Sequence, residues 1–154
     1  MQTQLAFLAV FESFAQIQNL LTYKKYVQLQ QLIQRTKPSI VRFLEDDELL
    51  HEALNVNSED AEQIYPLYKI IDEFIDSTLA TWRQIDPFIF AGNENLSDEF
   101  NDFLAYSLLA FSKFKELTEI FRVTAENHPI DEQSIEYQDF AMEYTALIEQ
   151  KQPQ

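Results

Sequence analysis

The clearest pattern of hydrophobic and polar positions lies between residues 97 and 125. Apolar or small side chains recur there at alternating steps of three and four residues: Phe100, Phe103, Ser107, Ala110, Phe114, Leu117 and Phe121. This spacing is typical of a helix that packs one face into a core. Ser97 is a favourable N-cap, and the acids that follow it favour the positive end of a helix. We therefore predict a loop over residues 92–97 and a long helix that begins at Ser97.

The same periodicity, interrupted by capping residues and prolines, predicts the other helices. The first covers residues 3–21, and a run over 23–35 is either a separate helix or a continuation of the first. Another helix starts at Pro38, and an acidic segment capped by Asn57 or Ser58 kinks or ends near Pro66. Two further helices cover residues 67–85 and a stretch from about residue 131. Short connections between amphipathic helices favour antiparallel neighbours. We expect an all-α, single-domain antiparallel bundle of about six helices over residues 1–150, followed by a short polar tail at 151–154.

Composition supports the helical prediction. The 154-residue chain contains 46% hydrophobic residues, 13 Phe and 7 Tyr, so it has the material for a core. Gly92 is its one glycine. Because tight hairpins and phosphate-binding loops depend on glycine, both are disfavoured.

The absence of cysteine removes disulfides, thiolate metal sites and cysteine nucleophiles. The N-terminal apolar run has no basic residue before it and is interrupted by Glu12, unlike a signal peptide. No stretch approaches the ~20 apolar residues of a membrane span. We expect a cytoplasmic protein.

Charge is distributed unevenly along the chain, whose formal net charge is −15. Residues 1–44 contain five bases and one acid, a net +4, whereas residues 45–154 contain six bases and 25 acids, a net −19. Such a field repels nucleic acids and anionic membranes and attracts basic proteins. The expected partner is therefore a protein with a basic surface or active site, and neither nucleic acid nor a membrane.

Residues 42–54, RFLEDDELLHEAL, contain the densest acidic run. If one helix continues from Pro38, Asp47 and His51 lie one turn apart on its apolar side, where a buried pair would have perturbed pKa values. Alternatively, Asp46 or Asp47 caps a new helix after a break, and His51 lies on the surface. Periodicity does not separate these geometries.

A metal site has weaker support. Glu48 and His51 have the Glu-x-x-His spacing of di-iron bundles, but those proteins need two such motifs and two further glutamates. The other histidine, His128, does not complete a second motif. A carboxylate–histidine metal protein or enzyme built on Asp47, Glu48 and His51 remains an alternative, but we expect no metal, no cofactor and no catalytic residue.

Two segments are candidates for partner binding. The first holds eight acids and no lysine or arginine within residues 45–62: Glu45, Asp46, Asp47, Glu48, Glu52, Glu59, Asp60 and Glu62. It is either a solvated face or a docking surface. In the second, Phe88 and Phe90 adjoin a polar loop and form either a plug at one end of the bundle or an exposed aromatic anchor.

These features favour a small acidic, non-enzymatic protein that binds and neutralises another protein, in the manner of bacterial immunity proteins and antitoxins. Its carboxylates would mimic phosphates or nucleic acid at a basic site. The alternative among binding proteins is a helical chaperone or adaptor for a secreted or assembling partner.

Overall fold

The computed structural model describes residues 2–90, 92–126 and 142, with the backbone alone for residues 2–9, 11, 87 and 88. Within this part of the chain there are five α-helices, one short 3-10 helix and no strand: α1 (Gln2–Thr22), α2 (Tyr26–Glu45), α3 (Glu48–Leu54), α4 (Ser58–Arg83), η1 (Pro87–Phe90) and α5 (Glu94–Ala125). The all-α prediction is confirmed. The expected helix from about residue 131 lies outside the described residues.

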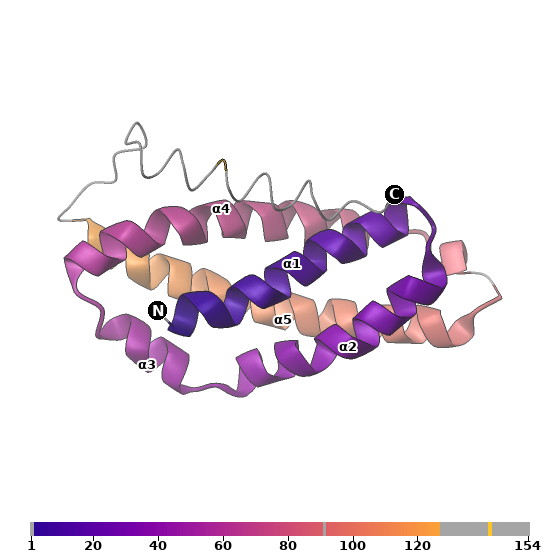
Figure 1. Ribbon diagram of the computed structural model, residues 1–154, viewed down its shortest axis with the longest axis horizontal. Coiled ribbons are helices and arrows are strands. Elements are labelled where there is room, and N and C mark those ends of the chain that lie inside the picture. Colours follow the sequence, from indigo (N-terminus) through magenta and orange to yellow (C-terminus); the bar gives the residue numbers. More distant parts are fainter. Residues whose placement is uncertain (1, 91, 127–141, 143–154) are drawn as a thin grey trace.

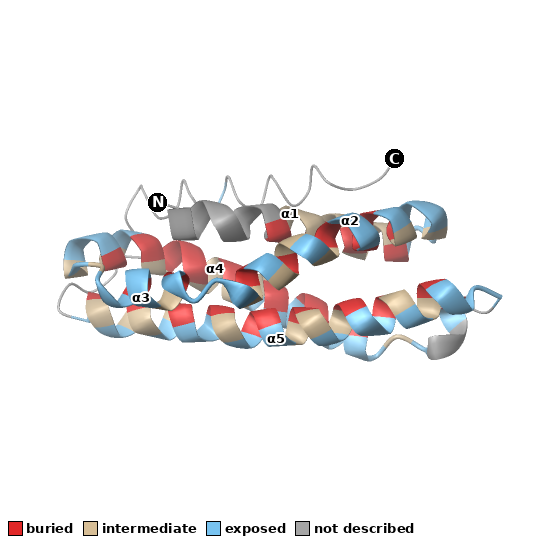
Figure 2. Ribbon diagram, turned by 90° about the horizontal axis from the view of Figure 1, so that it is seen from below, coloured by how far each residue is buried: buried red, intermediate tan, exposed pale blue. Residues whose placement is uncertain are grey.

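Four long helices form the bundle, and α3 lies at one end of it, between α2 and α4 (Figure 1). Helix α5 packs against both α2 and α4, while α1 packs against α2 and α4 on the other side (Figure 2). Buried positions of all four long helices face one another in the interior (Figure 2). Successive long helices run in opposite directions, so the predicted antiparallel arrangement holds for the described residues (Figure 1).

Both prolines predicted to start, kink or end a helix lie inside longer helices. Pro38 is within α2 and Pro66 is within α4. An interior proline removes one backbone hydrogen bond and costs about 3 kcal/mol. Each helix nevertheless continues its buried stripe beyond the proline, for example to Ile40 and Phe43 in α2. Burial of these side chains outweighs the local cost, so the predicted helix start at Pro38 is wrong, and α4 does not end near Pro66.

Residues 3–36 form two helices. Helix α1 ends at Thr22 and α2 begins at Tyr26. Between them, Lys24 has a φ of 57°, in the left-handed region that breaks a helix. The backbone then doubles back, and α2 packs against α1.

The helix predicted from Ser97 begins earlier, at Glu94. Asn93 is its N-cap, because the Asn93 side chain accepts a hydrogen bond from the Leu96 amide at 3.0 Å. Leu96 is fully buried, which fixes this first turn against the core. The rest of the prediction is confirmed, since all seven members of the predicted stripe from Phe100 to Phe121 are buried.

Aromatic side chains fill the interior between the helices. The Trp82 ring of α4 lies 5.3 Å from Phe14 of α1 and 6.1 Å from Phe103 of α5, measured between ring centroids. The indole Nε1 of Trp82 donates to Oε1 of Gln18 at 2.7 Å, so this buried ring has a polar partner. Tyr68 of α4 stacks on Phe114 with 4.7 Å between centroids. These contacts tie α1, α4 and α5 into one core.

Among the described residues, no helix is both long and apolar enough for a membrane crossing.

Candidate functional site

The eight acids of residues 45–62 make up the region that we call the acidic surface. They lie at the end of α2, in the connection to α3, in α3 and in the first turns of α4, which follow one another along the chain (Figure 1). Seven of the eight side chains are exposed, and Glu62 is half-buried. Seven exposed carboxylates thus lie along this one stretch of the chain.

A break between α2 and α3 gives this surface its shape. Helix α2 ends at Glu45, and Asp46 has extended backbone angles. The Asp46 carboxylate then accepts a hydrogen bond from the Glu48 amide at 3.1 Å, which satisfies a free donor at the start of α3. Of the two geometries that the sequence left open, the structure therefore has the break and excludes one helix through residues 38–54.

Helix α3 is held against the bundle by its apolar side. Leu49 and Ala53 are buried, while His51 and Glu52 are exposed. The seven-residue helix is too short to be stable alone, so packing orients its carboxylates. Tertiary contacts therefore decide which way this part of the acidic surface faces.

Capping fixes the other half of the acidic surface. Asn57 is the N-cap of α4, and its side chain accepts a hydrogen bond from the Asp60 amide at 2.8 Å. Glu59 and Asp60 lie in the first turn, where the helix dipole stabilises negative charge. The dipole offsets part of the repulsion among these acids, so the fold tolerates their close packing.

Lys113 of α5 stabilises the break between α2 and α3. Its ammonium donates to the carbonyl oxygens of Phe43 at 2.5 Å and Asp46 at 2.7 Å. Burial lowers the pKa of Lys113, and the nearby charges of Asp46 and Asp47 oppose that effect. The carbonyls at a helix C-terminus lack partners within the helix, so Lys113 caps α2 and joins it to α5. Sequence reasoning missed this residue, because no local pattern connects position 113 with a helix end 67 positions away.

The buried Asp47–His51 pair does not form. Both side chains are exposed, as the break requires. In the described part of the chain, no three histidine, aspartate or glutamate side chains are grouped as metal ligands would be. His128 lies outside that part.

In the segment after residue 86, Phe90 forms the predicted plug, while the neighbouring Ile89 is 36% exposed. Phe90 is buried, and its ring lies edge-on to Tyr26 at 5.5 Å and tilted against Phe100 at 5.4 Å between centroids. It is therefore not available as an exposed anchor. Phe88 belongs to η1, but its side chain lies outside the described residues.

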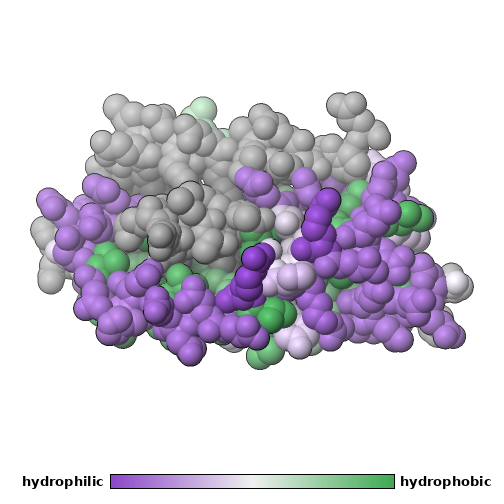
Figure 3. Space-filling view, turned by 60° about the horizontal axis from the view of Figure 1, so that its bottom comes forward, coloured by the Kyte–Doolittle hydropathy of each residue, from purple (hydrophilic) through white to green (hydrophobic). Residues whose placement is uncertain are grey.

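On the face drawn in Figure 3, hydrophilic side chains predominate and apolar ones form small, separate patches. The acidic surface is thus the candidate site with the most concentrated chemistry: carboxylates that accept hydrogen bonds and attract cations. No protein-family model matches the chain, and no curated protein or solved structure is significantly similar to it.

Proposed function

We propose that this protein is a non-enzymatic, neutralising inhibitor that binds a basic protein through its acidic surface. The carboxylates would occupy a site that normally holds phosphates, as in immunity proteins and antitoxins that block nucleases. The single observation that supports this proposal most is the exposure of seven carboxylates between the end of α2 and the first turns of α4.

The scaffold beneath these acids favours binding. Asp46 and Asn57 cap the two helices that carry most of the carboxylates, and Lys113 joins the break to α5. A pre-organised surface loses less conformational entropy on binding than a flexible acidic tail does. Opposite charge also speeds the encounter with a basic partner, by about 10–1,000-fold in favourable cases. A protein that must bind its partner quickly and tightly benefits from both pre-organisation and opposite charge.

The test compares two charge-reversal variants with equal net charge. The first replaces four members of the acidic surface with lysine: Glu45, Glu48, Glu52 and Glu59. The control replaces four exposed acids elsewhere: Asp76, Asp86, Glu94 and Asp98. Association with a fluorescent twelve-residue Lys/Arg peptide is followed by stopped flow at low and high salt, and circular dichroism verifies both folds.

We expect the first variant to associate at least about tenfold more slowly than the wild type at low salt, with the difference shrinking at high salt. The control should slow association by less than about threefold, because its charges lie away from the docking surface. Equal slowing by both variants would mean that only the overall charge attracts the peptide, and the proposal would fail.

A further inference from the structure

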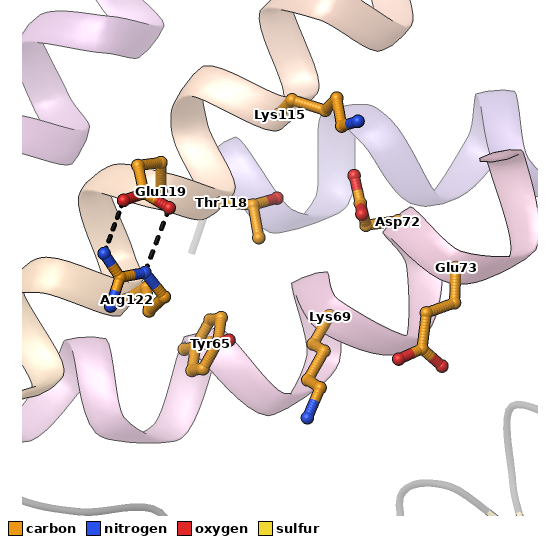
Figure 4. Close-up of a pocket in the computed structure, with 8 residues that line it drawn as sticks. All are labelled: Tyr65, Lys69, Asp72, Glu73, Lys115, Thr118, Glu119 and Arg122. Carbon is orange, nitrogen blue, oxygen red and sulfur yellow. Dashed lines mark hydrogen bonds and ion pairs between the residues drawn. The ribbon is translucent and has the colours of Figure 1, made fainter.

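A pocket of about 290 Å³ opens between α4 and α5, apart from the residues of the acidic surface. Its walls mix charged and aromatic side chains from the two helices (Figure 4). Tyr65 and Asp72 come from α4, and Lys115, Thr118 and Arg122 come from α5.

One carboxylate oxygen of Asp72 has no hydrogen-bond donor among the described residues. This oxygen, Oδ1, is buried. Burial raises the pKa of Asp72, the negative charges of Asp76 and Glu73 add to the rise, and Lys115 opposes it. The Lys115 ammonium lies 4.9 Å from the ring centroid of Phe111, on its own helix. A buried carboxylate oxygen without a donor is costly, so a donor from outside the chain would be bound favourably.

Three cations line the pocket, Lys69, Lys115 and Arg122, and carboxylates fully occupy Arg122. Arg122 donates from Nε to Glu119 at 3.0 Å and from Nη1 to Glu126 at 3.0 Å, and its Nη2 pairs with Glu119 as well. These carboxylates more than balance the charge of Arg122. Arg122 is therefore not a donor to Asp72, and Lys115 acts on Asp72 through its charge without a hydrogen bond to Oδ1.

Two further groups favour a planar cation. The Thr118 hydroxyl donates to the Phe114 carbonyl at 2.9 Å, so its oxygen lone pairs can still accept a hydrogen bond. In Figure 4, Thr118 lies between Asp72 and the Glu119–Arg122 pair, and the Tyr65 ring closes the opposite end from Lys115. A guanidinium can donate to two acceptors while its face stacks on an aromatic ring, which a compact ammonium does less well.

We infer that the α4–α5 pocket binds a guanidinium group, supplied by an arginine side chain of the partner protein. The Asp72 carboxylate accepts its N–H groups, the Thr118 oxygen accepts a further one, and the Tyr65 ring covers its face. The source of the arginine rests on the proposed function, because a basic partner of the acidic surface would carry such residues. The pocket would then be an anchor point that adds specificity to the electrostatic attraction.

The probe is N-acetyl-L-arginine amide, titrated into the full-length ¹⁵N-labelled protein, with N-acetyl-L-lysine amide as the comparison. We expect saturable amide shift changes centred on Tyr65, Asp72 and Thr118, with a Kd in the millimolar range and at least about fivefold weaker binding of the lysine compound. Asp72→Asn should weaken binding of the arginine compound by about tenfold, as expected when a charge-assisted hydrogen bond is lost. The matched control Asp76→Asn removes the same charge one helical turn away and should change the affinity by less than about twofold.

Shift changes spread over the surface, equal binding of the two compounds, or wild-type affinity of Asp72→Asn would each overturn the inference. The test does not involve the acidic surface, whereas the charge-reversal variants leave the pocket residues intact. Failure of the pocket and failure of the proposed function are therefore distinguishable.

Discussion

Replacement of Lys113 by methionine tests how the acidic surface is supported. Methionine keeps the apolar stem but removes the ammonium that donates to Phe43 and Asp46. A hydrogen bond to a charged group contributes about 1.5–3 kcal/mol, and the desolvation of the ammonium offsets part of the gain from two such bonds. We therefore expect a total loss of about 1.5–3 kcal/mol in the free energy of unfolding.

Urea denaturation followed by circular dichroism measures this loss, and hydrogen exchange locates it. The amides near the end of α2 and in α3 should exchange faster in the variant, because the break between them loses its tie to α5. Lys115→Met is the matched control: it removes the same charge two residues away, where the ammonium overlies Phe111 and acts on Asp72 through its charge alone. It should cost at most about 1 kcal/mol.

Equal destabilisation by the two variants would refute the reasoning, because it would mean that the loss of positive charge from an acidic protein explains the effect. Unchanged exchange in α3 would refute the placement of Lys113 as its support.

The other predictions concern the core and one perturbed carboxyl group. Phe103→Ala and Phe114→Ala should each cost about 3–5 kcal/mol in urea unfolding, because both rings are fully buried; near-unchanged midpoints would contradict the packing. Gln18→Leu should cost about 1–3 kcal/mol by the same assay, because it leaves the Trp82 Nε1–H without its acceptor, and a neutral result would mean that solvent satisfies the indole. Folding raises the pKa of Asp72, so ionisation of this carboxyl group destabilises the folded state above its ordinary pKa. Asp72→Asn should therefore be more stable than the wild type at pH 7 and lose this advantage below about pH 3. A pH-independent difference in urea unfolding would contradict the assignment.

The sequence was most informative where one repeated pattern had one structural solution. The stripe from Phe100 to Phe121 could be predicted residue by residue, because its spacing fits one face of a helix and nearly all of its side chains are apolar. The cap of α4 at Asn57 could also be predicted, since it depends on residues three positions apart. Both signals are local.

The features that could not be predicted from the sequence depend on residues that are distant along the chain. Helices α2 and α4 run through Pro38 and Pro66 because buried side chains beyond each proline compensate for the lost hydrogen bond. The position of the break after Glu45 is reinforced by Lys113, whose role no neighbouring residue reveals. The pocket around Asp72 likewise needs α4 and α5 to be placed side by side before it can be recognised.

Binding through the acidic surface is tested most directly by mapping where a basic ligand contacts the folded protein. The measurement is an amide chemical-shift titration of the ¹⁵N-labelled protein with the twelve-residue Lys/Arg peptide at physiological salt. The largest changes should fall on the end of α2, on α3 and on the first turns of α4, within residues 45–62. The exposed acids at the start of α5, such as Glu94 and Asp98, provide an internal comparison at the opposite end of the bundle. Shifts of equal size at both ends, or larger ones at the start of α5, would contradict the assignment of the acidic surface as the docking site.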